Sequence, residues 1–475
     1  MYRRSALAGL LMAVTLSSGA LAQAAAPSPD AIPKQHMEVV ESYGGLVSGD
    51  IATFVSQVGQ KVAVAAGKPG QCGFHVLNTN MVNAFTTPPG CHVYITRGLL
   101  AIINSEDELA GVLGHEVGHV TAKHAGKRQT RSILTGLGAL AVGIATGSGE
   151  AAQLASHAAQ LNVLSYSRSQ EYQADDLGVR YIGVAGYAPT GMVDVLRALD
   201  QEDRLDNRLR GVEGKATAVW ARSHPLTTDR ISRAAQRAQA AAANGAPRER
   251  EAPFLNAVDG LLYGDDPAQG YVEGRVFAHP GMGIGFSAPQ GYSLTNTPSA
   301  VLIDNPSGAR AQFGAGKASS DNLEAYVTAG LTQILGQTQA QVGRAQRTTI
   351  NGFPVVSQMA SAQTNSGVAE VTITAYAADG GQAFHFVTIA PAGRSGEFEP
   401  LLRSFHRLDA KEIAGWRPRR IGVVTVRTGD TAESLSRRMA FADYQLERFL
   451  LINALDANAK LTPGQSVKLV TYEQR

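Results

Sequence analysis

The sequence lacks the features that mark disulfide-rich, nucleic-acid-binding or membrane-spanning proteins. Its 475 residues include only two cysteines, and 42 Lys and Arg residues nearly balance 40 Asp and Glu residues. Two cysteines cannot form a disulfide framework, and without a basic excess there is no electrostatic case for nucleic acid as a partner. No apolar run reaches the roughly 20 residues that cross a bilayer as a helix. The hydrophobic content of 44% is ample for packed cores.

The first residues have the pattern of a cleaved secretory signal peptide, residues 1–22. A basic start, MYRR, precedes a short apolar run, and the small residues of GALAQ follow, so we expect cleavage after Ala22. An uncleaved anchor is the less favoured alternative, because the apolar run is too short. Cleavage removes Arg3 and Arg4 and no acid, which leaves 40 basic and 40 acidic residues. We therefore expect a periplasmic or secreted protein, with association to the membrane or cell wall left open.

Changes in composition divide the rest of the chain into three predicted folded parts, which together make a multidomain α+β protein. Residues 23–248 are predicted to be mainly helical, with a small sheet at 73–96. Residues 255–408 alternate apolar and polar positions and contain two helical stretches, which indicates an α+β module. This module has no recognisable constellation of ionisable residues, so its role is unknown. Residues 420–475 are predicted as strand, helix, helix and strand.

The segment 133–146 is apolar and rich in glycine. Its 14 residues are too few to span a bilayer. We favour a buried helix or a mobile cover over a cleft. Peripheral contact with a membrane is the alternative, since glycine permits mobility.

The stretch GHEVGHVTAKH at 114–124 contains three of the chain's 11 histidines. His115 and His119 are four residues apart and would share one face of a helix, where two imidazoles can bind one metal ion. Glu116 would lie beside the open coordination position and could take a proton from the attacking water. This is the H-E-x-x-H arrangement of zinc peptidases.

The third ligand must come from elsewhere. His124 lies nine residues after His115, nearly on the opposite side of such a helix, so we expect it to be an exposed polar residue. In SRSQEYQADDLG (167–178), Glu171 and Asp175 are again four residues apart. Glu171 is the candidate third ligand, and Asp175 could accept the free ring N–H of a ligating histidine. The alternative is two solvated acids on a surface helix.

HEVGH, EYQAD and SHPLTTDRI (223–231), in this order, resemble the zinc gluzincins of metallopeptidase family 48, related to the CAAX prenyl protease and the HtpX heat-shock protease. The resemblance covers residues 35–245. It implies an endopeptidase with one Zn²⁺ per chain, Glu171 as third ligand, protein or peptide substrates, and a role in envelope protein quality control. It also implies that His224 approaches the metal cleft, either to bind the transition-state oxygen or to cap the resting zinc. The proline after His224 favours extended backbone there.

The C-terminal stretch VTVRTGDTAESLSRRMAF, followed by LLINALDANAKLTPGQSVKLV, resembles a LysM module. LysM modules bind N-acetylglucosamine polymers, so peptidoglycan is an expected partner. A purely structural remnant is the alternative, because the loops offer few aromatic platforms. A LysM-targeted peptidoglycan hydrolase and a non-catalytic envelope-binding scaffold are therefore the alternative functions. The matching residues are Gly429, Asp430, Thr431, Leu435, Asn453, Leu455, Leu461, Gly464 and Gln465.

Cys72 and Cys91 flank a predicted strand, turn and strand. In an oxidising compartment we expect a disulfide between them. Metal binding by the pair is less favoured, because the spacing is not that of a zinc knuckle. We also expect the strand around Asn83–Phe85 to hold substrate by edge pairing.

Overall fold

The computed structural model describes residues 31–87, 90–124, 166–209, 220, 223–225, 228–242, 251–305, 308–336, 338–364 and 367–473. The expected signal peptide (1–22) and the apolar segment 133–146 lie outside these residues. Among the helices of the described part, none has the length and apolar character needed to cross a membrane.

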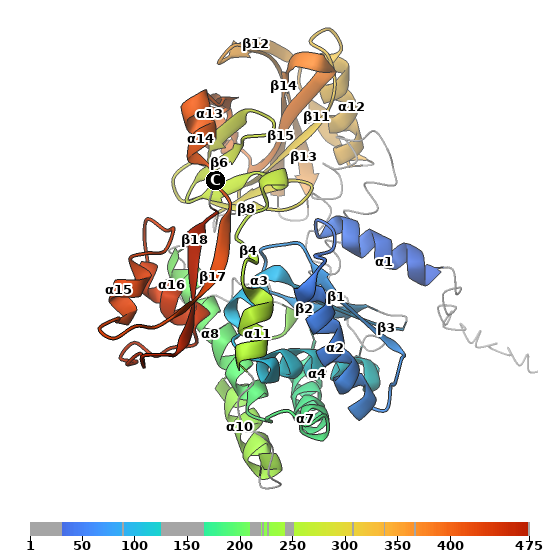
Figure 1. The fold of residues 1–475 in the computed structure, drawn as a ribbon. Helices are drawn as coiled ribbons and strands as arrows, with labels where there is room; N and C mark the ends of the chain where they lie inside the picture. Colours follow the sequence, from blue (N-terminus) through green and yellow to red (C-terminus); the bar gives the residue numbers. More distant parts are fainter. Residues whose placement is uncertain are drawn as a thin grey trace, which may run out of the picture.

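The first part of the chain is a helical domain around a three-stranded sheet (Figure 1). The sheet has the order β1-β3-β2, with β1 (Cys72–Leu77) parallel to β3 (Cys91–Thr96) and β2 (Ala84–Thr87) antiparallel to it. These strands agree with the sheet expected at 73–96. The helices are α1 (Ala31–Ser42), α2 (Asp50–Ala65), α3 (Arg97–Ile102), α4 (Glu106–Thr121), α7 (Arg168–Val184), α8 (Gly191–Leu209), α10 (Thr228–Ala242) and α11 (Glu251–Val258).

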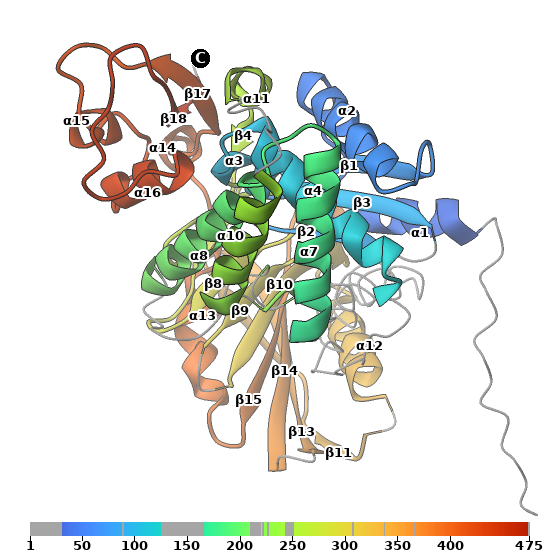
Figure 2. The same ribbon diagram turned by 90° about the horizontal axis from the view of Figure 1, so that it is seen from below.

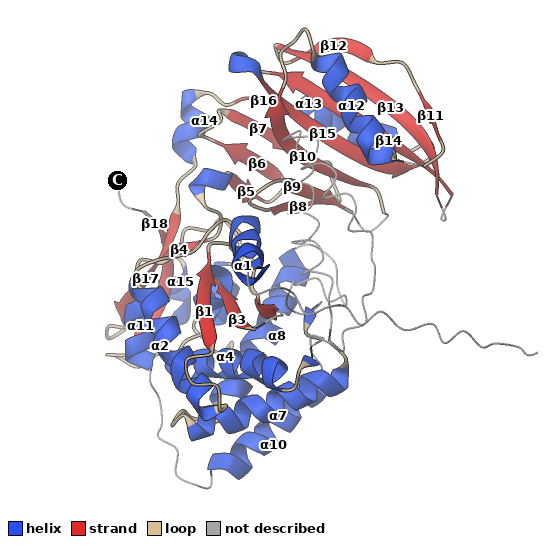
Figure 3. Cartoon of the chain, turned by 90° about the vertical axis from the view of Figure 1, so that its right-hand side faces the viewer, coloured by secondary structure: helices blue, strands red, loops and turns tan. Residues whose placement is uncertain are grey.

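Helix α4 is the central helix of this domain. Ser105 caps it as expected, since its Oγ accepts a hydrogen bond from the Glu108 backbone N–H at 3.1 Å. Every residue from Glu106 to His119 is buried, as in a helix covered on all sides. In Figure 3, α4 lies between the three-stranded sheet and the helices α7 and α10.

Glycines let α4 and α7 touch backbone to backbone. A Cβ added to Gly118 would lie 3.0 Å from the carbonyl oxygen of Ala174 and 3.3 Å from its Cα. A Cβ added to Gly178 would lie 3.1 Å from the His115 backbone nitrogen. Backbone atoms cannot move aside as a flexible side chain can, so residues larger than glycine do not fit at these two positions. In Figure 2, α7 crosses in front of α4 at this contact.

The middle module is built on an eight-stranded sheet of order β11-β13-β14-β15-β10-β9-β8, with β12 paired to β13, and a four-stranded sheet of order β16-β7-β6-β5. Its strands are β5 (Tyr271–Glu273), β6 (Val276–His279), β7 (Ile284–Ser287), β8 (Ser293–Asn296), β9 (Val301–Asp304), β10 (Arg310–Lys317), β11 (Ala340–Val342), β12 (Gln346–Ile350), β13 (Phe353–Thr364), β14 (Gly367–Ala377), β15 (Gln382–Pro391) and β16 (His406–Arg407). Its α-helices are α12 (Leu323–Leu335), α13 (Glu399–Ser404) and α14 (Ala410–Gly415).

Side-chain alternation along the strands gives the large sheet two apolar faces. On β13, Phe353 and Val355 belong to one buried cluster, whereas Val356 and Ala360 belong to another that includes α12 residues. This is the period of two expected of a strand. Helix α12 covers one face of the sheet (Figure 3). The middle module thus has the predicted α+β character, but Leu255 and Val258 of α11, at the start of the predicted range 255–408, belong to the core of the helical domain.

The C-terminal module has the predicted order of strand, helix, helix and strand: β17 (Arg419–Thr425), α15 (Ala432–Ser436), α16 (Gln445–Ile452) and β18 (Ser466–Tyr472). Its strands join β4 (Leu262–Tyr263) in a sheet of order β18-β17-β4. Its identity as a LysM module stays a prediction.

This module packs against the helical domain (Figure 1). Lys468 is fully buried, and its Nζ donates to the carbonyl oxygens of Ala101 and Ile103 at 2.8 and 2.6 Å, at the end of α3. Burial lowers the pKa of Lys468 and raises that of Glu108, and the charge of each opposes the shift of the other. The module is therefore anchored at the start of α4.

The contact between α4 and α7 predicts that two glycine substitutions will differ in their effect on stability. Gly118→Val should lower the free energy of unfolding by about 1–3 kcal/mol through overpacking. Gly183→Val is the matched control, because a Cβ there meets only Pro189 Cγ at an ordinary 3.7 Å. Chemical denaturation of the metal-free proteins measures both. Equal stability of the two variants would contradict the close packing at Gly118.

Candidate metal centre

Four side chains from distant parts of the chain meet inside the helical domain. His115 and His119 come from α4, Glu171 from α7, and His224 from the described segment 223–225. All four are buried, and one potential ligand atom of each lies within 4.8 Å of those of the others. The structure thus brings together the three candidate ligands with His224.

The distances between these atoms suit one metal ion. His115 Nε2 lies 3.0 Å from His119 Nε2. Glu171 Oε2 lies 3.6 Å from His115 Nε2, and Glu171 Oε1 lies 3.6 Å from His119 Nε2. Two ligand atoms of a tetrahedral ion, each about 2.0–2.2 Å from it, are about 3.3–3.5 Å apart. Two imidazoles and a carboxylate are also a donor set that catalytic zinc sites use. The residues present therefore fit a metal ion.

Asp175 holds the ring of His115. Its Oδ1 lies 2.9 Å from His115 Nδ1, so the ring donates its N–H there and keeps the lone pair of Nε2 for the cluster. Burial lowers the pKa of His115, which favours the neutral ring that a metal requires.

Arg230 fixes two carboxylates of α7, those of Glu171 and Asp175. Its Nε and Nη2 donate to the two oxygens of Asp175 at 2.9 and 2.8 Å, and Nη1 lies 2.7 Å from Glu171 Oε2. Burial alone would raise the pKa of Asp175, but Arg230 and His115 outweigh it and lower that pKa. Burial raises the pKa of Glu171 to about 7, although Arg230 opposes the shift. Arg230 therefore keeps Asp175 ionised and orients Glu171.

His124 is buried, and the expectation of an exposed histidine was wrong. Helix α4 ends at Thr121, and Lys123 has a φ of 55°, so the chain turns back instead of continuing the helix. His124 Nδ1 then lies 2.9 Å from His119 Nδ1, and its Nε2 lies 3.0 Å from Gln173 Oε1. We infer that His119 donates to His124, which donates to Gln173. His119 Nε2 is thereby left with its lone pair.

Glu116 lies beside the cluster and is fully buried. Its Oε1 is 3.6 Å from His224 Nε2. His224 Nδ1 lies 3.3 Å from His115 Nε2 and 3.2 Å from Glu171 Oε1. His224 therefore stands between the candidate base and the candidate ligands.

The His224 N–H donates to the carbonyl oxygen of Trp220 at 2.7 Å. Ser223 is helical, and His224 lies just beyond the helix. The extended backbone expected at His224, before Pro225, stays a prediction.

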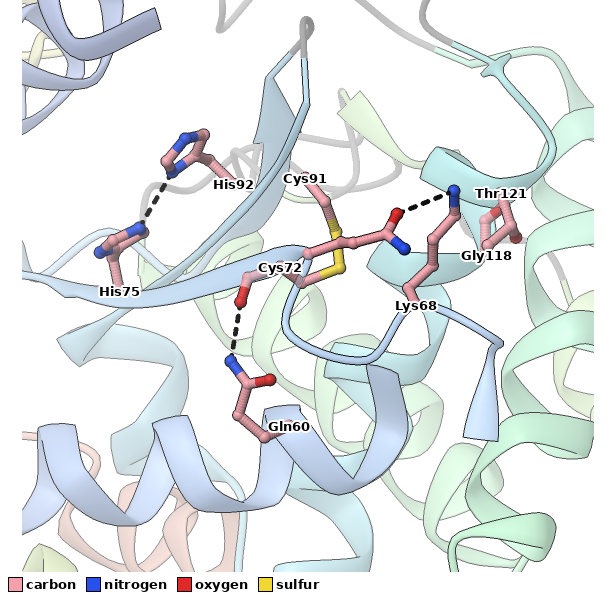
Figure 4. The surroundings of a disulfide bond; sticks show 9 residues. Gln60, Lys68, Cys72, His75, Cys91, His92, Gly118 and Thr121 are labelled. Atoms are coloured by element: carbon pink, nitrogen blue, oxygen red, sulfur yellow. Dashed lines mark hydrogen bonds between the residues drawn. A yellow bond between two sulfur atoms is a disulfide. The ribbon is translucent and has the colours of Figure 1, made fainter. Parts of the chain in front are cut away.

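Cys72 and Cys91 are joined by a disulfide, with their Cα atoms 4.5 Å apart. They are register partners at the start of the parallel strands β1 and β3. Gln60 of α2 donates to the carbonyl oxygen of Cys72 at 2.7 Å (Figure 4). Because the two thiols are bonded to each other, this pair is not a metal site.

Comparison with known proteins agrees with this geometry. Residues 52–238 match the model of peptidase family M48. This part of the chain belongs to that family. The chain is similar to the beta-barrel assembly-enhancing protease of Yersinia pestis, with 26% identity over 262 residues, or 49% of this chain and 52% of that protein.

Two further relatives carry protease names. The metalloprotease YcaL of Escherichia coli (strain K12) is 29% identical over 233 residues, covering 46% of this chain and 84% of that protein. The mitochondrial metalloendopeptidase OMA1 of Schizosaccharomyces pombe is 30% identical over 205 residues, covering 41% of this chain and 56% of that protein. The chain spans about half the length of the assembly-enhancing proteases that it matches.

Three residues around the candidate metal centre were not predicted from the sequence. Arg230 lies within the SHPLTTDRI motif, so the motif could have pointed to it. Tyr166 stacks on His119 with ring centroids 3.7 Å apart, and Trp220 stacks on His224 at 4.2 Å. Neither aromatic residue lies in a periodic pattern, so no sequence signal marked them.

The contact between His124 and His119 makes a testable prediction. His124→Ala should lower the apparent metal affinity about 10–100-fold, as for other residues that orient a ligand. A competing chelating dye measures the affinity. His406→Ala is the control, because His406 pairs with Glu412 in the middle module and should leave the affinity unchanged. An unchanged affinity in His124→Ala would show that His124 does not orient His119.

Proposed function

We propose that the protein is a zinc-dependent metalloendopeptidase of the bacterial cell envelope that hydrolyses misfolded or envelope proteins. The observation that carries the proposal is the buried set of His115, His119 and Glu171 with Glu116 adjacent, inside an M48 domain. The proposal on substrates draws on relatives named beta-barrel assembly-enhancing protease. A periplasmic or secreted location follows from the signal peptide expected at 1–22.

In the proposed reaction, zinc when bound supplies Lewis-acid chemistry that polarises the scissile carbonyl and acidifies water. Glu116 acts as general base, taking the proton of the attacking water and delivering it to the leaving amine. Its burial and its position next to His115 on α4 support this role. His115, His119 and Glu171 hold the ion, and Asp175 with Arg230 keeps two of these ligands oriented.

Strand β2 is our candidate for substrate binding. Among the described strands it pairs with β3 alone, at the end of the sheet order. The backbone groups of its other edge can pair with an extended peptide. Substrate binding by the strand around Asn83–Phe85, expected from the sequence, is therefore part of our proposal.

A peptidoglycan hydrolase is the second candidate function, favoured only by the LysM-like residues of the C-terminal module. Peptidoglycan as a partner is proposed on those residues alone. Incubation of the mature protein with unfolded casein and with purified muropeptides separates the two functions. Cleavage of muropeptides and not of casein would overturn the proteolytic assignment.

Glu116→Gln tests the mechanism. The variant should keep the metal and lose casein cleavage, because Glu116 is proposed as the base and not as a ligand; general-base loss costs about 100–10,000-fold. Glu171→Ala is the matched contrast and should lose the metal as well. Metal analysis and casein cleavage are measured on the same samples. Full activity in Glu116→Gln would rule out this role.

We further propose that His224 caps the resting centre, since its Nδ1 lies within 3.3 Å of both a histidine and the glutamate of the ligand set. His224→Ala should then raise basal peptide cleavage and retain zinc. A fall in kcat of about 100–1,000-fold with zinc retained would instead assign it to the oxyanion. A rate and a zinc content equal to those of the parent would exclude His224 from both roles.

A further inference from the structure

A second cluster of histidines lies away from the M48 site. His36 on α1, His75 on β1 and His92 on β3 each present one ring nitrogen within 4.8 Å of those of the other two. All three are partly buried. The cluster shares no residue with the proposed catalytic centre.

The strand register places two of these histidines on one face of the sheet. Gly73 pairs with His92, and His75 pairs with Tyr94, so His75 and His92 are diagonal neighbours. Figure 4 shows the two rings facing each other, with His75 Nε2 3.2 Å from His92 Nδ1. The disulfide of Cys72 lies next to them in sequence and pins the two strands at this end.

This separation suits two ligands of one metal ion. Nitrogens about 2.0–2.1 Å from a tetrahedral ion are about 3.3 Å apart. His36 completes the set from the helix above: its ring centroid lies 4.4 Å from that of His75 and 5.2 Å from that of His92. Its Nδ1 is 2.9 Å from the hydroxyl of Tyr94, which orients the ring. Modest rotations of these partly buried rings would bring a ring nitrogen of His36 to a similar distance from the ligand nitrogens of His75 and His92.

Glycine leaves space where an ion would sit. A Cβ added to Gly73 would lie 2.8 Å from His75 Nε2 and 3.4 Å from His92 Nδ1. Gly73 therefore keeps open the volume beside the two nitrogens that face each other. Any larger residue there would compete with an ion for it.

We propose that His36, His75 and His92 form a second metal site, which binds a divalent transition-metal ion of the zinc class through three imidazoles. Imidazole donors select zinc, copper or nickel rather than calcium or magnesium. Burial, together with the neighbouring rings of His36 and His92, lowers the pKa of His75 to about 4. Its ring is thus neutral at pH 7, as ligation requires.

Such an ion would cross-link helix α1 to the sheet. Val39 of α1 and Tyr43, which directly follows the helix, belong to a small buried cluster that also holds Phe85 of β2. The ion would therefore stabilise the packing of α1 on the strand that we propose for substrate binding. A metal site that joins separate elements adds its binding free energy to their association.

Metal stoichiometry tests the proposal on the intact mature chain. After dialysis against Zn²⁺ and removal of free metal, the parent should hold two ions per chain. Glu171→Ala, which disables the proposed catalytic centre, should hold one, and Glu171→Ala/His75→Ala should hold none. His406→Ala is the matched control and should hold two. The failure of the M48 site would leave the ion at the second site in place, so the two proposals fail separately.

A variant that keeps all three histidines distinguishes loss of the metal site from loss of the fold. Gly73→Ala in the Glu171→Ala background should lose the remaining ion or bind it at least tenfold more weakly, while circular dichroism stays unchanged. Zn²⁺ should also slow hydrogen exchange in α1 of Glu171→Ala but not of Glu171→Ala/His75→Ala. An ion that remains bound to a folded Glu171→Ala/His75→Ala protein, or a Glu171→Ala protein that binds none, would overturn the proposal.

Discussion

The backbone contact between α4 and α7 determines where every proposed catalytic ligand lies. Two histidines on α4 can share a metal with a glutamate on α7 only if the helices approach closely, because a glutamate side chain is short. Gly118 and Gly178 provide this approach, since a Cβ at either position would meet the backbone of the facing helix. The same contact brings Asp175, one turn after Glu171, within 2.9 Å of His115. The positions of the ligand Glu171 and of its neighbour Asp175 relative to His115 are thus fixed by one helix pair.

The charges buried around the centre explain why a divalent cation suits it. Glu116, Glu171 and Asp175 carry three negative charges when ionised, and Arg230 carries one positive charge, so the cluster has a formal charge of −2. Buried charge that lacks compensation is costly. One way to reduce the charge is to protonate Glu171, and burial raises its pKa to about 7. A dication bound by the ligands would balance the cluster with all three carboxylates ionised.

Short-range spacing was enough to pair His115 with His119 on one helix face and Glu171 with Asp175 on another, whereas the meeting of the two pairs was implied only by the family resemblance. These residues lie on regular helices, where a separation of four places side chains on one face. The same rule gave the wrong position for His124, because it cannot tell where a helix ends. The motif could have pointed to Arg230, but its pairing with Asp175 is found only in three dimensions, since Asp175 lies more than 50 residues earlier. Likewise, His36 lies far from His75 and His92 in sequence, and no spacing rule joins them.

The C-terminal module shows a further limit of what can be predicted from the sequence. Its strand and helix order could be predicted, but its packing could not. Lys468 donates to two carbonyl oxygens at the end of α3 and interacts electrostatically with Glu108 at the start of α4. Ile421 and Leu451 also belong to the core of the helical domain. Removing the module would leave these carbonyls and Glu108 without Lys468, at a cost that does not depend on glycan binding. Deletion of the module therefore perturbs the support of α4, which carries two of the proposed ligands, and loss of activity after deletion would not by itself indicate a binding function.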